Sequence, residues 1–393
     1  MELPAGGELP SPPPSGRGLG GGCMNQIATA LATADKADPE LVAAVVRAAL
    51  DRAGVGIARS VLLFLSTDFA HMAHAAVVAA SRAAHCLQVT GCTAPGVFTE
   101  EDWVLDRPAA CAMVFGGDCS LAAHPAADAP LLTLAAPNAV GGSWLQSGGP
   151  RYGLLSTDNS AHGAGRIWCH GKMATEGRGE TAIAGAHAAI GVSRGMHILS
   201  QPQPATSNGR DVLKAGAHPA LNALLRELPV ALREMEKLPF HLLAAGVVAG
   251  DPQRAIEEGR YTLVPIIAAS HDERSVTLAM PLEPGAQVFW AMRQPQAAAS
   301  DMRRLVDELD SRLGATPDFG LLFSCLGRGP YFFDGEDRDL AAVKARYPGM
   351  PLIGAYGGGQ IAPLFDGNRQ VHNTVVLALF AAHATDGGAR AHV

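Results

Sequence analysis

The residues best able to do chemistry lie in one stretch, GLLFSCLGRGPYFF, which spans residues 320–333. An apolar run in this stretch ends at Ser324 and Cys325, and Arg328 follows directly after Gly327. A guanidinium can hold a carboxylate through two parallel hydrogen bonds, and a glycine lets a ligand approach the backbone closely. The stretch therefore predicts a site for a small polar or anionic ligand where a strand ends.

A structural role for the same arginine is the first alternative. Arg328 could pair with Glu336 or Asp337, a few residues further on, and so only fix the loop. The sequence alone leaves both interpretations open, because an arginine after a strand serves either purpose.

A catalytic role for Cys325 is the second alternative. A cysteine nucleophile needs a base within hydrogen-bond reach, and His372 or His271 could supply one. A free cysteine is more often a small buried apolar residue, and a nearby arginine would make its thiol more reactive. We therefore expect a binding protein rather than an enzyme. The alternatives are a hydrolase or transferase with Cys325 as nucleophile, and a protein-interaction scaffold that binds no ligand.

A glycine-dense turn follows a second apolar run near the C-terminus. Gly354 lies within the run, and the turn itself contains Gly359 as the last of three glycines. The turn lacks the Gly-Lys-Ser/Thr ending of a phosphate-binding loop. We expect Tyr356 and Gln360 to face a ligand cleft if the turn lines one. A turn that only requires glycine conformations is the alternative.

The order of these features occurs twice in the chain. LLFLS at 62–66 precedes a predicted helix and Gly91, and LLFSC at 321–325 precedes a predicted helix and Gly354. This order predicts two related strand-helix-strand units. Ligands collect at the carboxyl ends of strands in α/β sheets, so Ser66, at the end of the first run, joins the predicted site.

The alternation of apolar runs and amphipathic segments predicts an α/β protein. We expect two lobes with mixed sheets covered by helices, because not every connection between predicted strands is long enough for a helix. Helices are expected at 38–53, 71–85, 297–313 and 337–345, with a helical region from 217, and strands at 61–65, 110–115, 120–124, 261–269, 276–280, 287–292, 351–355 and 374–380.

Composition excludes several classes of protein. The net charge of −7 argues against a nucleic-acid partner, and no apolar run is long enough to insert into a membrane. The seven cysteines include no Cys-x-x-Cys pair, which is typical of free thiols in the cytoplasm. We expect no metal and no other cofactor.

The quoted segments resemble the FIST family of sensory and signal-transduction proteins. The resemblance covers 24–382 and is most specific in FGLLFSCLGRGPYFFDGEDRDLAAV, YPGMPLIGAYGGGQIAPL and VHNTVVLALF. Gln360 stands where the family pattern has Glu. The resemblance implies a FIST N-like domain at 24–239 and a FIST C-like domain at 240–382. It also implies a small ligand such as an amino acid, and a protein signalling partner.

The two ends of the chain have a different composition. Residues 1–23 are rich in Pro and Gly, so nothing in them offsets the entropy of ordering, and we expect this segment to be disordered. The tail at 383–393 is expected to be frayed.

Overall fold

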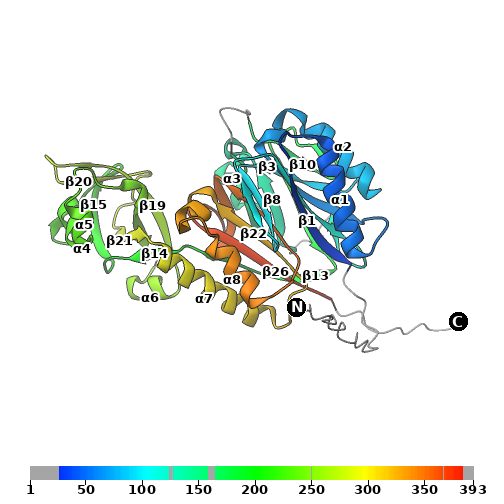
Figure 1. Ribbon diagram of the computed structural model, residues 1–393. Coiled ribbons are helices and arrows are strands. Elements are labelled where there is room, and N and C mark those ends of the chain that lie inside the picture. The colour runs from blue at the N-terminus through cyan, green and yellow to red at the C-terminus, as the bar shows by residue number, and fades with distance from the viewer. Residues whose placement is uncertain are drawn as a thin grey trace, which may run out of the picture.

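The computed structural model describes residues 26–123, 126, 128–157, 164–248, 250–365 and 367–383. The segment 1–23, all but the first residue of the tail 383–393, and His124 at the end of a predicted strand lie outside these ranges. The predicted α/β class is confirmed, since the described chain combines helices with mixed sheets (Figure 1).

Two units of the same topology form the main body. In each unit a strand leads to a helix, a buried strand, a second helix and a parallel strand, and a later strand inserts beside the first. The first unit consists of β1 (Ile27–Thr33), α1 (Pro39–Ala53), β2 (Ser60–Ser66), α2 (Ala73–Ala84), β3 (Val89–Ala94) and β6 (Ala109–Phe115). The second consists of β13 (Ala186–Ser193), α7 (Pro295–Leu313), β22 (Phe319–Cys325), α8 (Arg338–Arg346), β23 (Leu352–Gly357) and β26 (Val375–Ala382).

The strand orders of the two units correspond. One sheet runs β1-β6-β2-β3 and the other β13-β26-β22-β23, with β2–β3 and β22–β23 as the parallel pairs. All residues of β2 and β22 are buried, which explains their continuous apolar sequence. The predicted repeat therefore appears as two matching sheets within one body.

The two sheets pack face to face. Phe64 of β2 meets Phe323 of β22 edge-on, with ring centroids 6.0 Å apart, so corresponding residues of the two units touch. The helices cover the outer faces, α1 and α2 on the first sheet and α7 and α8 on the second. The result is a four-layer arrangement, which we call the sandwich, formed by residues 26–193 and 295–383.

The two halves of the sequence also exchange strands. β4 pairs with β23, and β24 pairs with β9 in a third sheet that completes the inner core. The division between 24–239 and 240–382 stays a prediction about sequence units, because these sheets contain strands from both sides of it. The remaining elements of the sandwich are β4 (Gly96–Thr99), β5 (Trp103–Leu105), β7 (Ser120–Ala122), β8 (Leu131–Ala135), α3 (Gly142–Gln146), β9 (Arg151–Leu155), β10 (Ile167–Cys169), β11 (Lys172–Met173), β12 (Arg178–Ala184), β24 (Gly359–Leu364) and β25 (Gly367–Val371).

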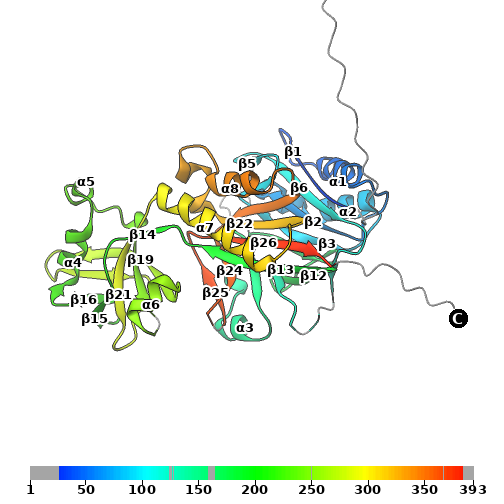
Figure 2. The same ribbon diagram turned by 90° about the horizontal axis from the view of Figure 1, so that it is seen from below.

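A separate antiparallel barrel is inserted between β13 and α7. Its strand pairings close in a ring, β21-β15-β16-β20-β19-β18 and back to β21, around an apolar core of its own. Figure 2 shows it beside the sandwich. The barrel, residues 196–293, contains β14 (Met196–Ile198), β15 (Gln203–Asn208), β16 (Asp211–Ala215), β17 (His218–Pro219), α4 (Ala220–Glu227), α5 (Val230–Arg233), β18 (Leu243–Val248), α6 (Pro252–Glu257), β19 (Tyr261–Ser270), β20 (Ser275–Leu278) and β21 (Gln287–Arg293).

Gly91 and Gly354 occupy corresponding places in the two units. Gly91 lies opposite Leu63, and a Cβ added to it would stand 1.7 Å from the Leu63 carbonyl oxygen. Gly354 lies opposite Leu322, and its Cβ would stand 2.0 Å from the Leu322 oxygen. Backbone atoms inside a sheet cannot move aside, so both positions require glycine.

We expect Gly354→Ala to lower the free energy of unfolding by about 3 kcal/mol, the upper part of the range for overpacked cores. Urea denaturation measures the change. Gly56→Ala is the matched control, because a Cβ added at Gly56 meets nothing within 4 Å. A loss at Gly354 no larger than that of the control would contradict the proposed steric role.

Candidate functional site

The loop after β22 lies where the barrel joins the sandwich. The Arg328 guanidinium is 1% exposed and donates to both carboxylate oxygens of Asp339 at 2.9 Å. It also donates to the Ser193 carbonyl at 2.9 Å, the Ser193 hydroxyl at 2.7 Å and the Ala298 carbonyl at 3.1 Å. Arg328 is thus held by four acceptor groups from three separate segments.

Two of the segments that Arg328 contacts lie directly before and directly after the barrel. Ser193 is the last residue of β13 before the barrel, and Ala298 lies in the first turn of α7 after it. One side chain therefore clamps both chain connections between barrel and sandwich. The contacts support the alternative in which Arg328 fixes its loop, with Asp339 rather than Glu336 or Asp337 as its ion-pair partner. A ligand contact of Arg328 stays a prediction.

Buried acidic groups surround this clamp. Asp337 caps α8 by accepting from the backbone of Asp339 at 3.0 Å and Leu340 at 2.9 Å, and it accepts from the Tyr356 hydroxyl. Burial raises the pKa of Asp337 and, despite the opposing effect of Arg328, raises the pKa of Asp339 to about 6. Burial, followed by the Asp337 charge, also raises the Tyr356 pKa well above its ordinary value.

A second set of contacts fixes the backbone that enters the barrel. One oxygen of Asp301, on α7, accepts from the Ser193 hydroxyl at 2.8 Å and from the backbone N–H groups of Arg194 at 2.8 Å and Gly195 at 3.0 Å. Burial opposes ionisation of Asp301, but these hydrogen bonds and one from Arg304 outweigh it and lower the pKa. The Arg194 side chain is left to point away from the clamp.

Arg293 ties the loop to the barrel on the other connection. It ends β21, donates to the carbonyl oxygens of Gly327 and His241, and stacks on the Phe332 ring at 4.9 Å. Gly327 therefore contributes a backbone acceptor to the junction.

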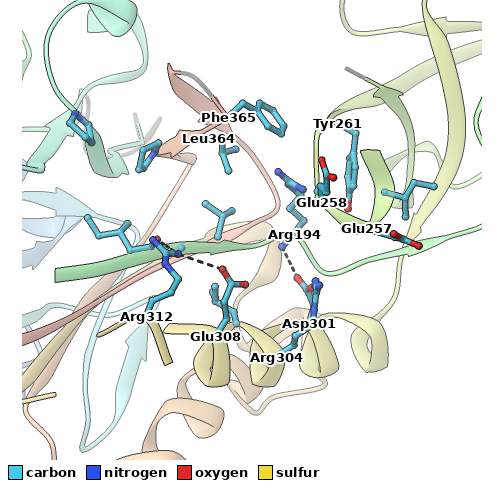
Figure 3. A pocket seen from close by; sticks show the side chains of 18 of the residues that line it. Arg194, Glu257, Glu258, Tyr261, Asp301, Arg304, Glu308, Arg312, Leu364 and Phe365 are labelled. Carbon is cyan, nitrogen blue, oxygen red and sulfur yellow. Dashed lines mark hydrogen bonds and ion pairs between the residues drawn. The ribbon is translucent and has the colours of Figure 1, made fainter. Parts of the chain in front are cut away.

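A cleft of about 520 Å³ opens between sandwich and barrel, and we call it the outer cleft (Figure 3). Both bodies contribute to its walls, including β13 and α7 from the sandwich and α6 and Tyr261 from the barrel. Its charged lining residues have both signs. They are Arg194, Arg304 and Arg312, with Glu257, Glu258, Asp301 and Glu308.

A smaller cavity of about 70 Å³, the inner pocket, shares a wall with the outer cleft. The shared wall consists of Arg194, Tyr261, Leu364 and Phe365. The Arg194 guanidinium lies 4.5 Å from the Tyr261 ring and 5.8 Å from the Phe365 ring, so it stands between an aromatic group of the barrel and one of the sandwich.

Three residues of the sequence-predicted site lie behind the inner pocket. Thr374 lines the pocket, its carbonyl accepts from the Cys325 N–H at 3.0 Å, and its hydroxyl donates to Gln360 Oε1 at 2.8 Å. A Cβ on Gly359 would contact His372, another lining residue, at 2.9 Å. Within the described ranges, the Cys325 thiol has no hydrogen-bond partner.

The contacts of the other predicted site residues lie away from the inner pocket. Ser66 donates to Asp68 at 2.6 Å and accepts from the Ala109 N–H at 3.1 Å, both in the first unit. Ser324 is fully buried, and its hydroxyl lies 3.4 Å from the Cys325 carbonyl. Gly354 packs on Phe98, and Tyr356 points to Asp337.

Sequence reasoning missed the residues that surround the two cavities. Arg194, Tyr261 and Phe365 come from three distant segments, and none is part of a recognisable spacing. His372 was considered only as a possible base for Cys325. One sequence feature could have pointed to Arg194: it forms an Arg-Gly pair with Gly195, directly after an apolar strand.

Comparison with known proteins identifies part of the chain. Residues 220–363 match the FIST C domain, which confirms the resemblance to the FIST family there, and this family is one of signal-transduction and sensory proteins. The match begins at α4 in the barrel and ends within β24, so it includes Cys325, Arg328 and Gln360. The FIST N region stays a prediction.

Two curated relatives are similar over about half of the chain. An uncharacterised protein of Mycobacterium tuberculosis is 28% identical over 217 residues, which cover 55% of this chain and 56% of the relative. An uncharacterised protein of Mycobacterium bovis is 28% identical over 191 residues, which cover 48% and 49%. The chain spans about half the length of the curated relatives it matches.

We expect Arg328→Met to lower the free energy of unfolding by about 3–5 kcal/mol, because the Asp339 charge would remain buried without its partner. Urea denaturation tests this. Arg303→Met, on the exposed face of α7, is the control and should change stability by less than about 0.5 kcal/mol. A loss below about 1 kcal/mol for Arg328→Met would mean that the clamp contributes little.

We also expect the Asp339 contribution to stability to fall as pH rises. The folded state keeps this proton up to about pH 6, whereas the unfolded carboxyl releases it near its ordinary pKa of 3.8. Folding therefore takes up a proton between these values, and the free energy of unfolding loses up to about 1.4 kcal/mol per pH unit.

Denaturation of the native chain and of Asp339→Asn from pH 4 to pH 8 measures this contribution. The stability of the native chain relative to the variant should decline by about 2 kcal/mol between pH 4 and pH 6 and be nearly constant above pH 7. The exposed Asp307→Asn is the control, with no such decline. A relative stability that rises over this interval would show that the Arg328 charge, rather than burial, dominates.

Proposed function

We propose that this protein, which carries a FIST C domain over residues 220–363, is a sensory protein that binds a small ligand between its sandwich and its barrel. The observation that carries the proposal is the outer cleft of about 520 Å³, to which both bodies contribute. Ligand sites are typically concave, have volumes of a few hundred Å³ and often lie between domains.

The way in which the barrel is attached supports a response to the ligand. Only two chain connections, at 194–195 and at 293–294, join the barrel to the sandwich, and both run beside Arg328 and its partners. A ligand that contacts both walls binds one relative arrangement better than others, and it shifts the population towards that arrangement by its differential affinity.

The lining charges favour a polar metabolite with groups of both signs. Arg304 and Arg312 already pair with Asp301 and Glu308 across single helical turns of α7, so these pairs neutralise each other. Glu257 of α6 faces the cleft and has no ion-pair partner in the described chain. A free amino acid carries an ammonium for such a carboxylate and a carboxylate for an arginine.

A signalling partner and a compartment complete the proposal. The described chain adds no recognisable catalytic output to the FIST C domain, so a partner protein would read the arrangement of the two bodies. None of the helices in the described ranges is long and apolar enough to cross a membrane. The cysteines resolved there have free thiols, which suits the reducing cytoplasm.

A thermal-shift screen against amino acids and other small metabolites tests the function. A ligand at 100 times its Kd should stabilise the chain by about 2.7 kcal/mol and raise its melting temperature. Small-angle scattering should show a smaller radius of gyration with the ligand, since contacts to both walls draw the barrel in.

Leu364→Trp should weaken the same binding at least tenfold, because Leu364 lies in the wall that the two cavities share and the larger ring fills them. Leu87→Trp is the control, since Leu87 is 76% exposed and lies outside both cavities. Equal binding by native chain and Leu364→Trp would place the ligand elsewhere.

A further inference from the structure

We infer that the inner pocket binds the carboxylate group of the ligand and that Arg194 is the side chain that holds it. This inference rests on the proposed function and assigns the ligand class and the anchoring residue within the same site.

The charge of the inner pocket favours an anion. Among the described residues that line it are two arginines, Arg194 and Arg369, and no Asp or Glu. The outer cleft, by contrast, contains four carboxylates. An anionic group therefore finds attraction without like-charge repulsion in the inner pocket only.

Arg194 is the arginine whose donors are available. Among the described residues its guanidinium makes no hydrogen bond or ion pair, whereas Arg304 and Arg312 in the same cleft each have a carboxylate partner. The Arg194 guanidinium lies over the Tyr261 ring, a contact that uses none of its N–H groups as donors to an oxygen or nitrogen atom. The planar fork of N–H groups matches the two oxygens of a carboxylate.

The position of Arg194 is set by its backbone rather than by its side chain. Asp301 holds the Arg194 N–H at 2.8 Å, and Arg328 holds the carbonyl of the preceding residue. The clamp that anchors the barrel thus also aims the guanidinium. Loss of its N–H donors changes binding without removing a hydrogen bond that the described fold uses.

His372 and Gln370 are the next polar side chains in the lining of the inner pocket. His372 Nδ1 lies 2.9 Å from the Gly358 carbonyl, which can only accept, so this nitrogen carries the proton. Its Nε2 then accepts from Gln370 Nε2 at 3.2 Å. Both side chains line the pocket, and neither brings a negative charge to its wall.

Gln360 keeps a negative charge away from the same wall. It is fully buried, its Oε1 accepts from the Thr374 hydroxyl, and its Nε2 has no partner in the described structure. A glutamate at this position would place a buried carboxylate directly behind Thr374. The glutamine therefore suits a pocket that receives an anion.

The volume limits what enters. A cavity needs about 10–15 Å³ for each water molecule that it holds. The inner pocket, with about 70 Å³, therefore holds a few water molecules or a carboxylate group, but not a whole metabolite. The rest of the ligand lies in the outer cleft, where the carboxylates suit an ammonium. The ligand class is a small carboxylic acid, with free amino acids as its simplest zwitterionic members.

Isothermal titration calorimetry with three sets of probes tests the inference. The probes are the free amino acids, the corresponding α-carboxamides, and inorganic phosphate. We expect at least one amino acid to bind the native chain and its carboxamide to bind at least tenfold more weakly. Equal binding of the carboxamide, or binding of phosphate without any carboxylate, would overturn the assignment of the inner pocket.

Matched variants identify the anchoring residue. Arg194→Met should weaken the amino acid at least tenfold, and Arg194→Lys, which keeps the charge but loses the planar fork, should weaken it less. Arg312→Met, which removes a rim arginine already paired with Glu308, should change Kd less than threefold. Unchanged binding by Arg194→Met would refute the role of Arg194, as would unchanged binding by Arg194→Lys if Arg194→Met does not fold.

The experiments distinguish a failure of the carboxylate inference from a failure of the proposed sensory function. A neutral or cationic metabolite that stabilises the native chain, and loses affinity in Leu364→Trp but not in Arg194→Met, would leave the sensor in place without a carboxylate site. If no metabolite binds at all, both proposals fall.

Discussion

The arrangement of the molecule depends on one buried cation. Arg328 has almost no access to water, so its charge must be met by protein acceptors, and the acceptors it uses belong to the strand that enters the barrel, the helix that leaves it and the helix after its own loop. Desolvation makes this cluster costly to form and costly to break. The relative placement of barrel and sandwich therefore depends on polar contacts at the two chain connections, with Arg328 in contact with both of them.

Local sequence patterns predicted the elements but not their assembly. The runs LLFLS and LLFSC, with the glycine that follows each, predicted two strand-helix-strand units. A continuous apolar run is typical of a strand buried on both faces, and the glycine lies where a neighbouring strand leaves no room for a Cβ. The same reasoning could not place β4 beside β23 or β9 beside β24, since strand exchange between halves leaves no periodic trace. The inserted barrel was likewise read only as separate strands and a helical region.

The sequence pointed to residues on one side of the inner pocket only. It singled out Cys325, Gly359 and Gln360 because a strand end and a glycine turn are visible in sequence. These residues contact Thr374 and His372, which line the inner pocket, and their own role in binding stays a prediction. The residues that face them depend on how the barrel lies, and Arg194, Tyr261 and Phe365 become neighbours only in the folded chain. For Arg328, sequence could not decide between a ligand and an internal acid, because both satisfy a guanidinium equally well.

The segment that matches the FIST C domain does not coincide with a complete sheet, as the pairing of β22 shows. The FIST C match ends at residue 363, yet β26, which lies beside β22 along its length, begins at Val375, and β13 and β4 of the same sheet precede residue 220. The matched segment thus contains β22 and its parallel neighbour β23, but it lacks β26, the antiparallel neighbour on the other side. A fragment limited to the match would therefore expose one edge of a fully buried strand.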